Sequence, residues 1–276
     1  GTVAGVQSPA GPRVSRFIIA GQTQFGPTDA PRVVRNLRDY TNTFGARSGG
    51  ANMYDAAETF FATGGSELVV QRAFGATPVN ATVTLDSKIT VTSRWPGAFY
   101  NAWTAQYTTA STTLTIVKGS TTVTYVGATA SALQAAASVD PDVTVTVSSL
   151  PVANFGPTAL STGNDDFANV NWTNVLAKIG PAAGPGAVAV PGVGSTANAA
   201  LAAHATTYRR LALLTPGQSD TSATVITAQG SISAANKQNA TYVYPWVKVP
   251  DGTGGLKVID GVSFAAGLRA VTQRTY

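Results

Sequence analysis

Residues 17–74 read FIIAGQTQFGPTDAPRVVRNLRDYTNTFGARSGGANMYDAAETFFATGGSELVVQRAF, and this stretch decides the fold. The apolar run at residues 17–20 stops at Gly21, which predicts a buried strand. A second apolar run at residues 68–70 predicts another strand after two intervening helices. The order strand, helix, helix, strand favours an α/β layer with parallel strands.

The two predicted helices are marked by capping residues and glycines. Asn36 is suited to cap the first helix, and Asp39 stands three residues later in the capping-box position. Gly45 ends this helix in the C′ role. The second helix has an apolar face that includes Met53 and Phe60, and it stops at the glycine pair that follows.

The composition changes near residue 78. Thr and Val dominate short runs at residues 82–85, 89–93, 103–108, 114–117, 122–126 and 143–147. Lys118-Gly119-Ser120 between two of these runs predicts a hairpin turn, and residues 131–137 predict a short helix. The region therefore predicts a β-rich module built like a small sandwich or open barrel.

The α/β pattern returns after residue 150. We expect strands at residues 187–190, 211–214 and 241–247, helices capped by Ser195 and Asp220, and a last helix at residues 262–272. Repeated strand–helix units imply right-handed crossovers and a mostly parallel sheet. The predicted architecture is a discontinuous three-layer α/β domain of residues 17–78 and 150–276. A β-rich domain at residues 79–149 is inserted in it, and residues 1–16 form an extended arm.

The composition narrows the function classes. Charged residues make up 11% of the 276, and the net charge of +5 is scattered, without the basic stripe of a nucleic-acid reader. Cysteine is absent, and no run of 18 apolar residues occurs. A surface with so little charge repels its neighbours weakly, which suits a protein that packs against its own copies. We predict no direct nucleic-acid contact, no membrane insertion, no metal and no cofactor.

One motif points toward nucleotide chemistry. The strand AVAVP is followed by Gly192-Val193-Gly194-Ser195-Thr196-Ala197 and a predicted helix, which is the context of a dinucleotide-binding loop. The acidic residue expected about 20 positions later is missing, and Arg209 and Arg210 stand there instead. A tight strand-to-helix turn explains the glycines better, although a nucleotide-binding α/β enzyme stays open as an alternative.

The other candidate groups also have simpler explanations. His204 lies on the apolar face of its predicted helix, so a buried, hydrogen-bonded histidine is expected rather than a general base. Asp165 and Asp166 precede a predicted helix, where capping explains them. The aromatics mark either core or interface, and sequence leaves that choice open: Trp95, Phe99, Tyr100, Trp103, Tyr242, Tyr244 and Trp246. We predict no catalytic residues and no enzyme.

A set of short sequence motifs, in a fixed order along the chain, resembles a known protein family. Gly26-Pro27, Asp39-Tyr40, Phe44-Gly45, Phe60-Phe61, Gly64-Gly65 and Arg72 occur in the order seen in contractile phage tail sheath proteins, which this stretch resembles. Later segments are similar to the same family: Trp95-Pro96-Gly97-Ala98 with Asn101, Tyr244-Pro245-Trp246, and Ala266-Gly267 with Arg269. The family also includes the sheaths of tailocins and contractile injection systems.

The resemblance implies a mechanical role. Sheath subunits stack as six-fold rings around a tail tube between baseplate and terminator. They contract and drive the tube through a bacterial envelope during DNA delivery. The α/β domain is implied to have subtilisin-like topology, and terminal arms add strands to neighbouring subunits. The implied location is the virion tail, assembled in the host cytoplasm.

The family normally continues beyond the Ala-Gly-x-x-Arg segment into a further C-terminal domain and arm. We therefore expect this chain to be a trimmed piece that is mainly monomeric in solution, with a short natural variant as the alternative. The Thr-rich insert leaves a second alternative function, a cell-surface or carbohydrate-binding module.

Overall fold

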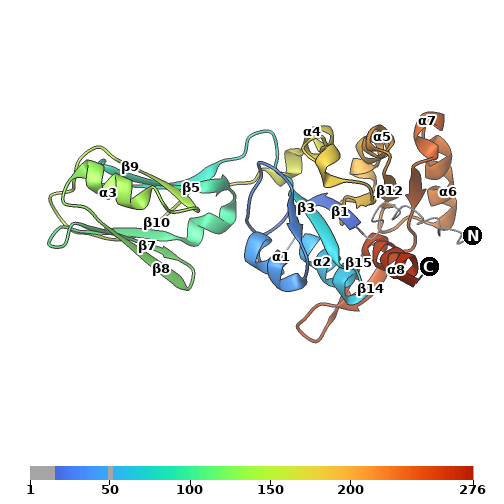
Figure 1. The fold of residues 1–276 in the computed structure, drawn as a ribbon, viewed down its shortest axis with the longest axis horizontal. Coiled ribbons are helices and arrows are strands. Elements are labelled where there is room, and N and C mark those ends of the chain that lie inside the picture. Colours follow the sequence, from blue (N-terminus) through green and yellow to red (C-terminus); the bar gives the residue numbers. More distant parts are fainter. Residues whose placement is uncertain (1–15, 49–51, 276) are drawn as a thin grey trace, which may run out of the picture. The chain divides into compact units, whose positions relative to one another are not determined.

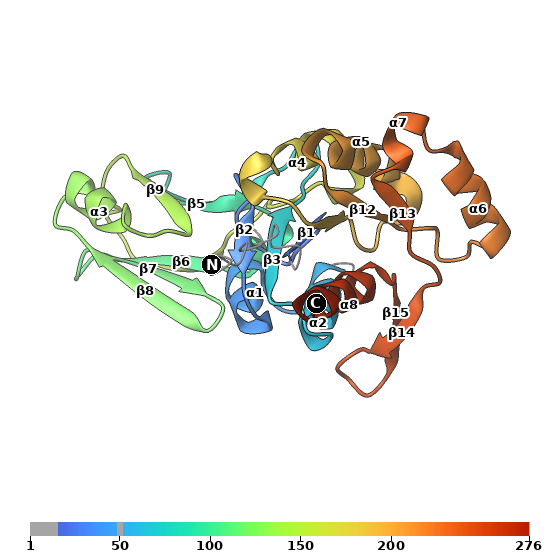
Figure 2. The ribbon, with the colours of Figure 1, turned by 45° about the vertical axis from the view of Figure 1, so that its right-hand side comes forward.

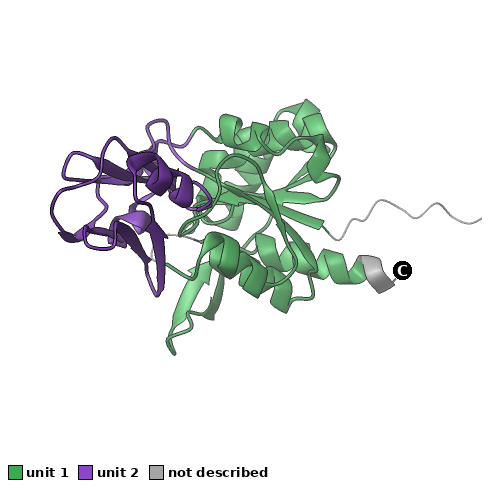
Figure 3. Ribbon diagram, turned by 60° about the vertical axis from the view of Figure 1, so that its left-hand side comes forward, with its two compact units in different colours: residues 1–73, 171–276 green, residues 74–170 purple. Residues whose placement is uncertain are grey.

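The computed structural model describes residues 16–48 and 52–275, so the predicted arm lies outside the described residues apart from Arg16. The chain forms two compact units (Figure 3). Unit 1 comprises residues 1–73 and 171–276, and unit 2 comprises residues 74–170. The chain thus leaves unit 1 at residue 73 and re-enters it at residue 171, rather than at residues 78 and 150.

Unit 1 is built on a six-stranded sheet with the order β13-β12-β11-β1-β3-β2. The strands are β1 (Arg16–Gly21), β2 (Arg32–Val34), β3 (Glu67–Arg72), β11 (Ala187–Ala189), β12 (Leu211–Leu214) and β13 (Ala240–Tyr242). All neighbours pair in parallel except β2, which runs antiparallel to β3 at one edge. The sequence did not reveal β2, because three residues after a proline carry no readable period.

Helices cover both faces of this sheet (Figures 1 and 2). One face carries α1 (Leu37–Phe44), α2 (Met53–Ala62) and α8 (Val262–Thr275), and the other carries α4 (Trp172–Ala177) and α5 (Asn198–Tyr208). Phe17 and Ile19 alternate along β1 toward α2, where Phe17 packs on Phe60 with ring centroids 5.3 Å apart. The arrangement is a three-layer α/β unit.

The helix boundaries predicted for α1 are confirmed. The Asn36 side chain accepts a hydrogen bond from the Asp39 N–H at 2.8 Å, and Gly45 follows the helix with φ of 92°. A Cβ at Gly45 would lie 2.4 Å from the side chain of Gln24, so both φ and space require glycine. The Asp39 carboxylate accepts from the N–H of Arg35 rather than closing a capping box on Asn36.

Two predicted caps in the second half of unit 1 are wrong. A 3-10 turn, η4 (Gly194–Ala197), precedes α5, so Ser195 does not cap that helix. Thr221 caps α6 (Ser222–Ser231), while Asp220 accepts from the N–H of Gly217 at 2.6 Å in the preceding loop. Both caps were misplaced because a short turn moved the N-cap by two residues for α5 and by one for α6.

The predicted strand at residues 241–247 is confirmed only at its start. β13 ends at Tyr242, and a separate antiparallel hairpin begins at Val247. This hairpin consists of β14 (Val247–Pro250) and β15 (Leu256–Ile259) and leads into α8, which the sequence predicted. The break follows from Pro245, which cannot donate to a ladder inside a sheet. The short helix α7 (Ala234–Lys237) and the 3-10 turn η3 (Pro181–Ala183) complete the connections.

Unit 2 consists of two antiparallel sheets, shown one above the other in Figure 1. One has the order β4-β5-β9, with β4 (Asn80–Leu85), β5 (Ile89–Pro96) and β9 (Val143–Val147). The other has the order β10-β6-β7-β8, with β6 (Thr104–Thr108), β7 (Thr113–Lys118), β8 (Thr121–Val126) and β10 (Phe155–Ala159). The turn η1 (Ala98–Ala102), helix α3 (Ala130–Ala137) and the 3-10 turn η2 (Phe167–Asn169) complete it.

The predicted β-rich character and the β7–β8 hairpin are confirmed, with Gly119 at φ of 63° in the turn. Unit 2 extends beyond residue 149 because β10 pairs with β6, and residues 161 and 164 bridge to the margin of β4. Strands β4, β5, β6 and β9 bury every second side chain along most of their length, as at Val143, Val145 and Val147 of β9. No helix in the described residues is both long and apolar enough to cross a membrane.

Candidate functional site

The strand order places a topological switch point between β1 and β11. From β1 the chain first adds β3 on one side and later adds β11, β12 and β13 on the other. Open α/β sheets bind ligands in the crevice at the carboxyl ends of the strands at such a point. The Gly192–Ala197 loop follows β11 at this position, so the crevice is the first candidate site.

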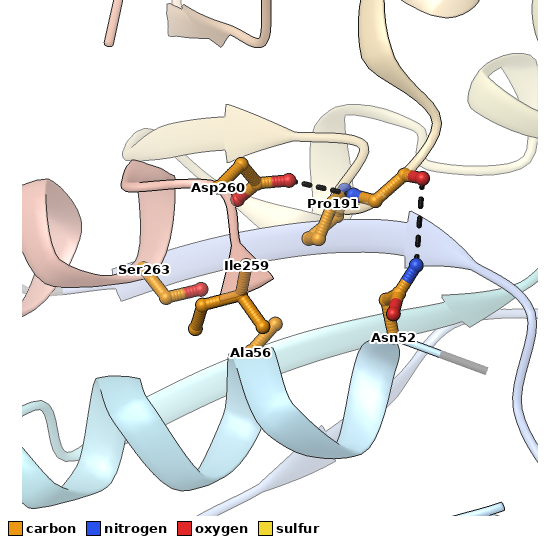
Figure 4. Close-up of a pocket in the computed structure, with 7 residues that line it drawn as sticks. Asn52, Ala56, Pro191, Ile259, Asp260 and Ser263 are labelled. Atoms are coloured by element: carbon orange, nitrogen blue, oxygen red, sulfur yellow. Dashed lines mark hydrogen bonds between the residues drawn. The ribbon is translucent and has the colours of Figure 1, made fainter. Parts of the chain in front are cut away.

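The crevice is filled by the protein itself (Figure 4). The Gly192 N–H donates to Asp260 Oδ2 at 2.6 Å, and Asn52 Nδ2 donates to the Gly192 carbonyl at 3.4 Å. Met53 lies against the end of β1, where a Cβ at Gly21 would be 2.8 Å from its sulfur. The cavity lined by Asn52, Gly192 and Asp260 measures about 10 Å³, room for roughly one water molecule.

The electrostatics of this crevice oppose an anion. Asp260 is 2% exposed and sits in the connection between β15 and α8. Burial raises the pKa of Asp260 to about 6, although hydrogen bonds from the backbone N–H groups of Gly192 and Val262 act in the opposite direction. A pyrophosphate needs free N–H donors at this loop, and here a carboxylate already takes the N–H of Gly192.

Gly192 and Gly194 therefore serve a tight turn. Both have positive φ, 79° and 60°, and a Cβ at Gly192 would lie 2.0 Å from the Asn52 side chain. The helix that follows is anchored by tertiary contacts rather than a cap. Asn198 Nδ2 donates to the Thr215 carbonyl at 2.9 Å, and the Thr215 N–H donates to Asn198 Oδ1 at 3.3 Å.

His204 is buried and hydrogen-bonded, as the sequence predicted. It is 7% exposed, and its Nε2 lies 2.7 Å from a guanidinium nitrogen of Arg210. Burial, with the charge of Arg210 second, lowers the pKa of His204 to about 4. A neutral imidazole that accepts from an arginine cannot take up a proton at neutral pH without losing that contact, so His204 does not fit a general base.

Arg210, the partner of His204, is also buried and also binds backbone carbonyls. It is 2% exposed and donates to the carbonyls of Ile179, Gly180 and Gly184 at 2.7 to 3.0 Å. Its charge is spread over backbone acceptors of the loop between α4 and β11. The His204–Arg210 pair thus holds this loop on the end of α5.

Asp165 and Asp166 close the base of unit 2 instead of capping a helix. Asp166 Oδ2 accepts from both the N–H and the hydroxyl of Thr77 at 2.9 Å, and it makes no capping bond to η2. The Asp165 carbonyl accepts from the Gly75 N–H at 2.8 Å. Residues 75–77 and 165–166, where the chain enters and leaves unit 2, are joined by these bonds. The predicted capping role is therefore wrong for this pair.

The aromatic side chains divide between packing and exposure. Tyr100 and Trp103 are buried in unit 2, with ring centroids 4.9 Å apart in an edge-to-face contact. In unit 1, Trp246 Nε1 donates to the Pro216 carbonyl at 2.9 Å, and Tyr242 accepts from Asn198 at 3.3 Å. Tyr244 is 45% exposed. Most of this set is structural.

Asp260 and Arg210 were not singled out from the sequence. Asp260 stands in the segment KVIDG, where an aspartate before glycine resembles an ordinary turn residue. Arg210 follows Arg209 at the end of a helix, where exposed basic residues are common. Nothing local distinguishes them, because their partners lie 68 and up to 31 residues away.

Comparison with known proteins shows which solved structures share this fold. No protein-family model and no curated protein matches the chain. Solved structures similar to it include two sheath tail proteins. A sheath tail protein from Listeria innocua has a TM-score of 0.63 and 17% identity, and the match covers 96% of this chain and 57% of that one. A sheath tail protein from Desulfitobacterium hafniense has a TM-score of 0.61 and 18% identity, covering 99% and 62%. The chain spans about three fifths of these structures, and the resemblance predicted from the sequence is confirmed at the level of the fold.

Proposed function

We propose that this chain is the core of a contractile tail sheath subunit, a structural protein and not an enzyme. The observation that carries the proposal is the fold, which matches two sheath tail proteins over nearly the whole chain, insert included. The closed crevice supports it, because the position where an α/β enzyme would bind its ligand is occupied by Asn52 and Asp260.

In this proposal the full protein polymerises as six-fold stacked rings around a tail tube, between a baseplate and a terminator. It contracts to drive the tube through a bacterial envelope during DNA delivery. The energy for such a change lies in different subunit contacts in two states, so no cofactor is needed. The α/β unit has the subtilisin-like topology implied by the family, and the β-rich insert faces outward, where added modules are tolerated.

An antibody raised against this chain tests the proposal directly. Contractile particles from the source organism are incubated with the antibody and examined by electron microscopy with gold label. We expect gold along the entire shaft of extended particles and along the shortened sheath of contracted ones. Label confined to one end of the particle, or none on intact tails, would contradict a sheath role.

The outward position of the insert has its own test. A short peptide tag is placed in the full-length protein after Gly119, at the tip of the β7–β8 hairpin, where a Cβ would meet open space. We expect particles to assemble and to bind anti-tag antibody along the shaft. Assembled tails that hide the tag would contradict an outward-facing insert while leaving the sheath role intact.

A further inference from the structure

The edge strand β8 of unit 2 presents backbone groups that no other element pairs with. β8 is joined to β7 on one side and forms the margin of the sheet β10-β6-β7-β8. Figures 1 and 2 show it as the outermost strand of that sheet. Its six residues, Thr-Thr-Val-Thr-Tyr-Val, contain no charge, glycine or proline.

The hairpin geometry shows which groups point outward. Gly127 N–H donates to the Thr112 carbonyl at 3.2 Å, so this pair is hydrogen-bonded across the hairpin. Bonded and non-bonded pairs alternate along an antiparallel ladder. The N–H and C=O of Thr122, Thr124 and Val126 therefore point away from β7. Within the described part of the chain, no hydrogen bond reaches them from another element.

The other margins in unit 2 are each interrupted by a local feature. Residue 161 pairs with Thr82 on the outer side of β4, and residue 164 pairs with Val79 just before β4, through four backbone bonds of 2.7 to 3.0 Å in all. The outward N–H of Val147 on β9 donates to Gln134 Oε1 at 2.8 Å, from α3. β10 contains Pro157 and a register break between Phe155 and Thr158. A paired segment, a bond from a helix side chain and a proline with a register break are devices by which proteins prevent pairing at sheet edges, and in the described residues none of these three acts on the outward backbone groups of β8.

The margins of unit 1 are blocked or short as well. β2 has three residues, and Pro31 precedes it. β13 also has three residues. The β14–β15 hairpin carries Lys248 and Lys257 along with Pro250. Among the described strands, the available edge of matching length on a second copy is therefore β8 itself.

We propose that β8 is a self-association edge, at which two copies of this chain pair antiparallel about a two-fold axis. The axis passes between Thr124 and its counterpart, and Thr122 lies opposite Val126 of the second copy. Three bonded pairs form in this register, and each exchanges two N–H···O bonds. An interface with the same patch on both copies closes as a dimer. The uncharged strand offers no repulsion, and Val126, now 60% exposed, is covered.

The contact is small, so the affinity is low. A single pair of short strands buries less than a standard interface, and we expect a dissociation constant on the order of 10⁻⁴ M. The chain then stays mainly monomeric at micromolar concentration and dimerises near 1 mM. The inference concerns this chain alone and does not depend on the sheath role.

The test is sedimentation equilibrium of the 276-residue chain from about 10 μM to about 1 mM. Thr124→Pro removes an outward N–H and no ladder bond within the hairpin, so the unit still folds. Thr124→Lys keeps the N–H but sets two ammonium groups face to face across the axis. Ala130→Pro is the matched control, because it places a proline at the first position of α3 and leaves β8 unchanged.

We expect the weight-average mass of the wild type and of Ala130→Pro to rise from 28.1 kDa toward twice that value. The dissociation constant should be at least about tenfold weaker for both Thr124 variants, and the amides of Thr122, Thr124 and Val126 should shift with concentration in NMR spectra. A wild type that stays monomeric at about 1 mM overturns the proposal. Association that survives both Thr124 variants, or that disappears only when residues 1–15 are removed, overturns it too.

Discussion

Replacing Asp260 by Asn should change how the stability of unit 1 depends on pH. Burial raises the pKa of Asp260 from its ordinary 3.8 to about 6. A difference of about two pKa units corresponds to about 3 kcal/mol. Because the folded-state pKa is raised, the stability linked to this proton is fully present below about pH 4 and is lost as pH rises through 6.

His204 produces the opposite dependence in the same unit. Its pKa falls from 6.5 to about 4, so its contribution is present above pH 6.5 and is lost as pH falls through 4, again about 3 kcal/mol. The two effects nearly cancel in the wild type. Asp260→Asn should leave the pH dependence of unit 1 stability that His204 causes, and His204→Gln should leave the one that Asp260 causes. The two slopes of stability against pH should have opposite signs.

Urea unfolding at pH steps from 4 to 7.5 measures both slopes. Tryptophan fluorescence reports on both units, with Trp172 and Trp246 in unit 1 and Trp95 and Trp103 in unit 2, so separate unfolding of the units gives two transitions. Relative to the wild type, Asp260→Asn should gain about 2 to 3 kcal/mol as pH rises over this range. His204→Gln, whose amide oxygen still accepts from Arg210, should gain a similar amount as pH falls.

Only the change of the unfolding free energy with pH is compared, so any pH-independent effect of a substitution on stability cancels. If the difference in unfolding free energy between Asp260→Asn and the wild type did not change with pH, the raised pKa of the buried Asp260 carboxyl would be refuted. A slope of the wrong sign would refute it as well. The urea midpoint of unit 2 should change with pH by the same amount in the wild type and in both variants.

The remaining predictions concern packing, a buried ion pair and ligand binding. Gly267→Ala should destabilise unit 1 by about 1–3 kcal/mol in urea unfolding because a Cβ there would overlap the end of α2, whereas Gly230→Ala in α6, which meets nothing within 4 Å, should stabilise it by about 0.5–1 kcal/mol. Equal effects would contradict the close α2–α8 contact. Lys118→Met should lower the stability of unit 2 by about 3 kcal/mol, because it leaves the carboxylate of Asp140 (side chain 1% exposed) without its cation. Lys88→Met, from a half-exposed pair, should cost less than about 1 kcal/mol, and a similar loss in both would argue against burial as the cause. Millimolar NAD or ATP should leave the melting temperature unchanged, since a ligand at 100 times its Kd would add about 2.7 kcal/mol, and a clear rise would reopen the nucleotide reading of the crevice.

The sequence alone determined the elements whose signal is local. An apolar run ended by Gly21 located β1, and an apolar run after the Gly64-Gly65 pair located β3. Asn36 and Gly45 bounded α1, because capping depends on residues within four positions. The Thr–Val alternation located the β-rich insert for the same reason, since strand period needs no distant partner. The buried state of His204 could also be predicted, from its place on an apolar helix face.

Tertiary structure decided what depends on distant partners. β10 joined unit 2 because it pairs with β6, some fifty residues earlier in the chain, although its own residues are mostly exposed and include Pro157. Asp260 closed the crevice because the β15–α8 connection lies beside Gly192, 68 residues away in sequence. Burial, hydrogen bonding and pKa arise from that proximity, and a sequence period carries no information about it.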